Sequence, residues 1–137
     1  MMTLALVGPS GCERKAPGVS AKRFTEGVLL DMQERAFDRL YDKLTRDRRR
    51  ELSQEEYSRY NAAGFEKLDR LGGYFDDWQV DESASQIGDT EASVVVLTHA
   101  TFAGASAPSE HRRRLVFKLV KEGDDWKFDS FTSAPIP

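Results

Sequence analysis

The period of the hydrophobic pattern changes once along the chain, at Gly72-Gly73, and this change constrains the fold more than any other feature. Before it, apolar residues recur every three or four positions, which is the spacing of one helix face. After it, apolar and polar residues alternate, which is the spacing of a strand with one buried face. The sequence therefore predicts helices first and strands second, as in an α+β domain.

The first helical segment is predicted over residues 24–44, with Thr25 as its N-cap. Its apolar stripe consists of Leu29, Met32, Ala36, Leu40 and Leu44. A break at residues 31–33, giving two helices, is the alternative to one continuous helix.

The second helical segment is predicted over residues 52–71. It begins with a capping box, in which Ser53 accepts from the backbone three residues on and Glu56 reaches back. Its buried stripe consists of Tyr57, Tyr60, Gly64, Leu68 and Leu71. Gly72-Gly73 then ends the helix, because glycine adopts the left-handed conformation at no steric cost.

Four strands are predicted after the glycines, separated by a turn at Gly88-Asp89, a loop over residues 104–109 and a turn over residues 122–125. They cover residues 78–84, 92–102, 113–119 and 126–130. Because the connections are short, the strands are expected to pair as hairpins. The predicted fold is α+β, with N-terminal helices packed on a four-stranded antiparallel sheet.

Length and charge limit the class of protein. The chain has 137 residues, which suits one domain, and its formal net charge is -3 with acids and bases interspersed. This balance argues against nucleic-acid binding, which requires a basic face. The basic clusters at residues 48–50 and 112–114 are expected to be solvated. One cysteine and two widely spaced histidines, His99 and His111, predict no metal site and no cofactor.

The N-terminus carries the one cysteine, Cys12, after an apolar run at residues 2–7 and the small residues Ser10-Gly11. This pattern resembles the end of a bacterial lipoprotein signal peptide, in which the cysteine is lipidated. The resemblance implies a signal remnant at residues 1–12, a flexible tether at 13–22 and a lipid-anchored place in the bacterial cell envelope, on the periplasmic or extracellular side. The alternative is a disordered tail with an unreactive cysteine.

Three stretches carry a second resemblance, to a fold family. They are AFDRLYDKLTRDRRRELSQEEY at 36–57, GDTEASVVV at 88–96 and FKLVKEGDDWKFDSF at 117–131. Together with the order of elements, they resemble small bacterial secreted members of the nuclear transport factor 2-like superfamily. The likeness implies one domain over residues 23–133, followed by a tail at 134–137. It also implies a cone, in which a strongly curved sheet wraps a long helix and leaves a pocket at the open end.

Candidate pocket residues follow from the strand alternation and the helix stripes. Side chains that share a face with the apolar positions would point into the cone. They are Tyr41, Tyr57, Tyr60, Trp78, Glu82, Thr98, Arg113, Phe117, Trp126 and Ser130. An Arg, a Glu and hydroxyl groups around an apolar cavity would suit a small amphipathic or anionic ligand. The alternative is that the aromatic residues are core and that Glu82 and Arg113 lie at the surface.

Three functions remain open from the sequence. The favoured one is a non-catalytic module of a bacterial envelope lipoprotein that binds a small ligand or an envelope protein, because no nucleophile, metal set or phosphate loop is recognisable. The alternative is an enzyme of isomerase or dehydratase type that uses a pocket carboxylate such as Glu82. The third is an accessory protein that forms a homodimer through its sheet.

Overall fold

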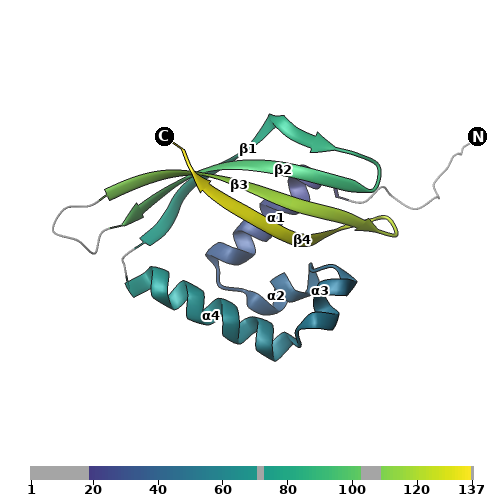
Figure 1. Ribbon diagram of the computed structural model, residues 1–137, viewed down its shortest axis with the longest axis horizontal. Coiled ribbons are helices and arrows are strands. Elements are labelled where there is room, and N and C mark those ends of the chain that lie inside the picture. Colours follow the sequence, from purple (N-terminus) through teal and green to yellow (C-terminus); the bar gives the residue numbers. More distant parts are fainter. Residues whose placement is uncertain (1–18, 71–72, 103–108, 137) are drawn as a thin grey trace, which may run out of the picture.

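The computed structural model describes residues 19–70, 73–102 and 109–136, and within these ranges four helices precede four strands (Figure 1). The helices are α1 (Ala21–Gln33), α2 (Phe37–Asp42), α3 (Arg46–Glu51) and α4 (Gln54–Arg70). The strands are β1 (Gly73–Ile87), β2 (Glu91–Phe102), β3 (Ser109–Glu122) and β4 (Asp125–Pro135). The predicted α+β class is confirmed. No helix in these ranges is long and apolar enough to cross a membrane.

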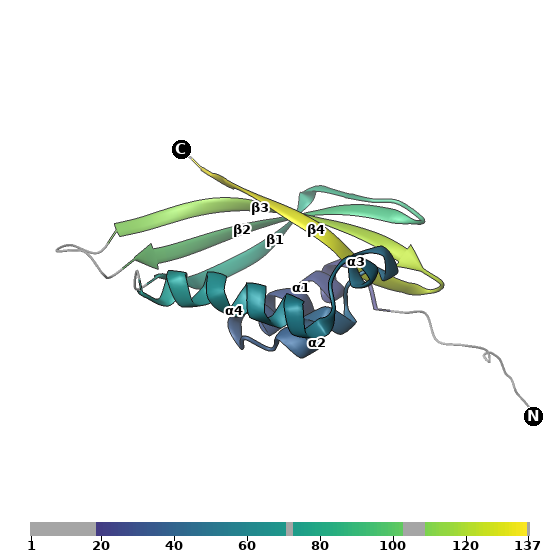
Figure 2. The same ribbon diagram turned by 60° about the horizontal axis from the view of Figure 1, so that its bottom comes forward.

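The four strands form one antiparallel sheet in the order β1-β2-β3-β4. All four helices lie on the same side of the sheet (Figure 2), which we call its inner face. The sheet is twisted and open, with β1 and β4 as its edges, and it is neither closed nor strongly curled. The strong curvature expected from the fold resemblance is therefore not supported.

The core lies between the inner face and the helices. On β2, Val94 and Val96 are fully buried and alternate with side chains on the outer face, as the period of two predicts. Phe117 on β3 meets them, and Val28 and Leu40 close the core from α1 and α2. Burial of this apolar stripe supplies the main stabilisation of the fold, because hydrophobic burial is the dominant favourable term in folding.

Helix α1 begins earlier than predicted. Ser20, not Thr25, is its N-cap, and its side chain accepts a hydrogen bond from the backbone N–H of Arg23 at 3.2 Å. Thr25 is buried inside the helix, where its hydroxyl donates to the carbonyl of Ala21. The first turn therefore includes residues 21 and 22, which were expected to belong to the tether.

The first helical segment is two helices, as the alternative had it, but the break lies at residues 34–36 and not at 31–33. Arg35 adopts the left-handed conformation (φ 57°), which reverses the chain between α1 and α2. Asp31, only 5% exposed, joins the two helices by accepting from Arg39 Nε at 3.0 Å and from Lys43. A buried carboxylate with two cationic partners thus holds this corner, since buried charges require such pairing.

Helix α3 was not predicted, and the segment leading into it covers part of the β4 edge. The backbone N–H of Phe128 donates to the carbonyl of Lys43 at 2.7 Å, and Thr45 donates back to Phe128 at 3.0 Å. Arg48, expected to be solvated, donates from Nε to the backbone carbonyl of Asp129 at 3.0 Å. These bonds occupy the first half of an edge that would otherwise expose unpaired backbone groups.

A β-bulge in β4 decides which residues face the helices. Leu119 pairs with Phe128 and Lys118 with Ser130, so Asp129 is one residue more than β3 can match. Beyond the bulge, Phe131 pairs with Phe117 and shares its inner face. The predicted alternation therefore fails after Phe128, and the strand continues through Ala134 and Pro135, which were expected to form a tail.

The capping box of α4 is confirmed. The Ser53 backbone N–H donates to Glu56 Oε1 at 3.0 Å, and the Glu56 N–H donates to Ser53 Oγ at 3.2 Å. The first of these bonds lowers the pKa of Glu56, because it favours the charged carboxylate. The resulting stabilisation is present above the unfolded pKa of Glu56 and is lost as the pH falls through its lower folded pKa.

The substitution Ser53→Ala is expected to lower the free energy of unfolding by about 1 kcal/mol, because it removes the N-cap acceptor. Urea denaturation followed by circular dichroism measures this change. Ser58→Ala in the same helix is the matched control, and it should be neutral or slightly stabilising because alanine is the better helix former. Equal losses from both substitutions would contradict the capping role.

Candidate ligand-binding site

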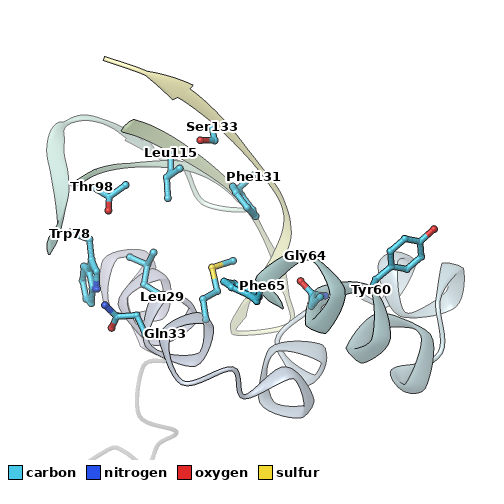
Figure 3. Close-up of a pocket in the computed structure, with 12 residues that line it drawn as sticks. Leu29, Gln33, Tyr60, Gly64, Phe65, Trp78, Thr98, Leu115, Phe131 and Ser133 are labelled. Atoms are coloured by element: carbon cyan, nitrogen blue, oxygen red, sulfur yellow. The ribbon is translucent and has the colours of Figure 1, made fainter. Parts of the chain in front are cut away.

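A cavity of about 340 Å³ lies between α1, α4 and the inner face of the sheet (Figure 3). This volume is near the lower end of the roughly 300–1,000 Å³ typical of ligand pockets. The lining residues are Leu29, Met32, Gln33, Tyr60, Asn61, Gly64, Phe65, Trp78, Thr98, Leu115, Phe131 and Ser133. Every strand and the two longest helices contribute to the wall, so the site depends on the assembled fold.

The helices present their lining residues through regular spacing. Helix α1 contributes one face of its last turns, at positions i, i+3 and i+4: Leu29, Met32 and Gln33. Helix α4 contributes the neighbours Tyr60 and Asn61 and, one turn later, Gly64 and Phe65. At Gly64 an added Cβ would meet no atom within 4 Å, so this position opens the wall of the cavity.

The strands present their inner-face residues in cross-strand pairs. Trp78 on β1 lies opposite Thr98 on β2, and Leu115 on β3 lies opposite Ser133 on β4. Phe131 enters this wall because the bulge at Asp129 turns it inward. Figure 3 shows Thr98, Leu115 and Phe131 on the sheet side of the cavity, opposite Leu29, and Trp78 at one side next to Gln33.

The lining is mainly apolar, and none of its twelve residues is charged. Three of its polar groups already have partners. The Thr98 hydroxyl donates to the carbonyl of Asp77 at 2.9 Å, the Asn61 amide donates to the carbonyl of Tyr57 at 2.8 Å, and Ser133 Oγ accepts from Arg113 Nε at 2.7 Å. The amide of Gln33 makes no hydrogen bond to any described residue. Such a wall suits a small molecule with a large apolar surface and few polar groups.

Three of the ten candidate pocket residues line the cavity, namely Tyr60, Trp78 and Thr98. Tyr60 lies at the rim, since it is 71% exposed and its ring points away from the centre (Figure 3). Arg113 does not line the cavity but lies next to it, because its Nε donates to Ser133 Oγ at 2.7 Å. The structure therefore brings four of the ten candidates together.

Four other candidates are packing residues. Phe117 and Trp126 belong to the buried core. The Tyr41 hydroxyl donates to the carbonyl of Leu52 at 2.8 Å, and its ring lies 5.7 Å from that of Tyr57. Burial raises the pKa of Tyr57. These tyrosines join α2 to α4 and do not line the cavity.

The last two candidates lie elsewhere because of local irregularities in the strands. Glu82 is in an irregular part of β1, between Asp81 and Gln86, where its 69% exposed side chain pairs with Lys22 at 2.8 Å. It is therefore not paired with Arg113. Ser130 follows the bulge at Asp129, pairs with Lys118 on the outer face, and its hydroxyl donates to the carboxylate of Asp129. Neither residue reaches the cavity.

The lipidation candidate and one of the two histidines are not placed by the structure. Cys12 lies outside the described residues. The side chain of His111 is likewise not described, and His99 lies on the outer face of the sheet opposite Arg112. Within the described ranges, no group of three or more His, Cys, Asp or Glu residues is arranged to hold a metal ion.

No protein-family model and no curated protein matches the chain. Among solved structures, the chain is similar to a SEC-C motif containing protein from Rhodopseudomonas palustris, with a TM-score of 0.58 and 15% identity over 82% of this chain and 77% of that one. The intermembrane space region of the chloroplast protein ARC6 also matches, with a TM-score of 0.47 and 11% identity over 86% of this chain and 99% of that one. The first likeness shows a shared fold and nothing about function.

Proposed function

We propose that this protein is a non-catalytic binding module whose cavity holds a small, largely apolar molecule. The observation that carries the proposal is the wall of the cavity. Six large apolar or aromatic side chains surround it, namely Leu29, Met32, Phe65, Trp78, Leu115 and Phe131. Burying an apolar ligand against them would contribute about 25 cal/mol for each Å² removed from water.

The proposal places this module in the bacterial cell envelope, anchored through a lipid on Cys12. Its support is the sequence pattern around that cysteine, and the structural description starts at residue 19. We also propose membership of the nuclear transport factor 2-like superfamily. The helices on one face of an antiparallel meander support this assignment, whereas the open sheet lacks the strong curvature of the expected cone.

An interaction protein is the second candidate, supported by the outer face of the sheet. In the described part of the chain no helix covers this face (Figure 2). Near its centre lie the half-buried side chains of Leu97 and Val116, whereas Val95, which pairs with Val116, is buried. Acidic Asp77 and Asp81 lie on β1, and basic Arg112 and Arg114 lie on β3. If a second copy were related by a two-fold axis parallel to β2, with the outer faces together, the acidic residues of β1 would lie over the basic residues of β3 in the other copy. This charge complementarity favours a homodimer through the sheet.

The enzyme alternative has less support. An isomerase of the expected type needs a carboxylate base inside an apolar pocket. No described residue that lines the cavity has a carboxylate, and Glu82 pairs with Lys22 at the surface. A small isomerase or dehydratase would therefore need a base from outside the observed wall.

Native mass spectrometry of the protein isolated from its own cells tests the proposal. We expect a non-covalent adduct of a few hundred daltons that is lost on denaturation, and saturable 1:1 binding of the neutral apolar fluorophore 1-aminoanthracene after its removal. A protein that carries no adduct and binds no fluorophore would contradict the proposal. A dimer mass in the same spectrum would support the second candidate, and an added lipid mass would support the anchor.

A further inference from the structure

We infer that the molecule bound in the cavity is an amphipathic carboxylic acid whose carboxylate is held by Arg113 at the edge of the cavity. The inference rests on the proposed binding function and names the class of its ligand. Its basis is the position of one cation beside a wall that is itself uncharged.

Arg113 belongs to the inner face of β3 and has lining residues on both sides. It pairs with Thr98 across the ladder to β2. On the other side its Nε donates to Ser133 Oγ at 2.7 Å. Because Thr98 and Ser133 both line the cavity, the Arg113 guanidinium lies at the cavity edge, where a head group of a bound molecule would emerge.

Among the described residues, the guanidinium of Arg113 has one side-chain partner, Ser133. Its Nε is occupied by Ser133, and no carboxylate of a described residue lies within ion-pair distance of its two terminal amino groups. Arg39 and Arg48, in contrast, are each paired with carboxylates of this chain. The hydrogen bond to Ser133 also orients the planar guanidinium, and a planar, oriented pair of N–H donors matches a carboxylate.

The cavity sets the size of the apolar part. At about 30 Å³ for each water-sized group, a volume near 340 Å³ has room for roughly ten methylene-sized groups. A linear acid of about ten carbon atoms, or an aromatic acid of similar size, fits this space. A charged group placed deeper would be buried without a partner, so the head group belongs at Arg113.

Decanoate and decanol provide a matched pair of probes, because they share a chain and differ in the head group. Isothermal titration at pH 7.5 should show that the wild-type protein binds decanoate about tenfold more tightly than decanol. Arg113→Gln should weaken decanoate about tenfold and leave decanol within twofold. Arg114→Gln is the matched control, since it removes the same charge from the outer face of the same strand and should change neither affinity by more than twofold.

Several outcomes would overturn the inference. If the wild-type protein bound decanoate and decanol equally and Arg113→Gln changed neither affinity, the cavity would bind its ligand without help from a charged head group. The proposed function would then stand, and the inference about the carboxylate would be wrong. An equal loss for both probes in Arg113→Gln would show that Arg113 only supports the wall. Binding of neither probe, together with no binding of 1-aminoanthracene, would overturn the proposed function as well. Thermal unfolding of each variant confirms that the fold is intact.

Discussion

The substitution Gly64→Leu is expected to weaken binding of 1-aminoanthracene about a hundredfold while raising the thermal stability of the protein. Gly64 is an exposed residue of the cavity wall, and a Cβ there meets no atom within 4 Å, so a leucine side chain has room without a clash beside the space that the ligand would occupy. It would displace about four methylene-sized groups of ligand contact, worth roughly 0.8 kcal/mol each. The total of about 3 kcal/mol corresponds to roughly a hundredfold in affinity.

The stability gain has a separate cause. Glycine inside a helix costs about 1 kcal/mol relative to a good helix former, and residue 64 is in the middle of α4. Ala62→Leu is the matched control, because position 62 is likewise exposed and on the same helix but does not line the cavity. A Gly64→Leu protein that is more stable and binds the fluorophore as tightly as the wild type would show that the cavity is not the binding site.

The substitution Phe117→Ala is expected to have the largest effect on stability, a loss of about 3–5 kcal/mol in the free energy of unfolding. Phe117 is fully buried, and its ring centroid lies 5.7 Å from that of Phe128 and 5.3 Å from that of Phe131. A domain of this size has about 5–15 kcal/mol of stability in total, so the variant should be close to unfolding. Urea denaturation at 25 °C measures the change.

Phe131→Ala is the control from the same ring cluster. Phe131 is 44% exposed and lines the cavity, so its removal should cost only about 1–2 kcal/mol in stability but should weaken ligand binding. If Phe131→Ala destabilised the protein as much as Phe117→Ala, the division between core and cavity wall in this region would be wrong.

The features that depend on local periodicity could be predicted from the sequence. The capping box of Ser53 and Glu56 needs only a spacing of three residues, and the structure shows both of its hydrogen bonds. The inner face of β2 needs only alternation, and Val94, Val96 and Thr98 are buried as expected. Both signals lie within a few neighbouring positions of the chain.

The features that depend on pairing between strands could not be predicted. The bulge at Asp129 arises because β4 has one residue more than β3 in their ladder. As a result Phe131, and not Ser130, lies on the inner face and in the cavity wall. The irregular part of β1 likewise removes Glu82 from the inner face. Sequence alternation assumes a regular ladder, so one inserted residue reverses every later assignment.

The cavity itself was only partly visible in the sequence. Leu29 and Met32 were recognised as members of an apolar stripe, but such a stripe cannot distinguish core residues from cavity wall. The one available signal was Gly64, a residue without a side chain inside the apolar stripe of α4. Which residues face that gap depends on how α1 and α4 meet the sheet, and this is a property of the tertiary structure.

The central claim is that the space between α1, α4 and the inner face of the sheet is a binding site. Mapping of backbone amide chemical shifts during titration with 1-aminoanthracene tests it most directly, because it reports where the molecule binds. The account predicts that the largest shifts cluster at residues of the cavity wall, including Gly64, Thr98 and Ser133. Shifts that cluster instead around Leu97 and Val116 on the outer face, or no saturable shifts at all, would contradict it.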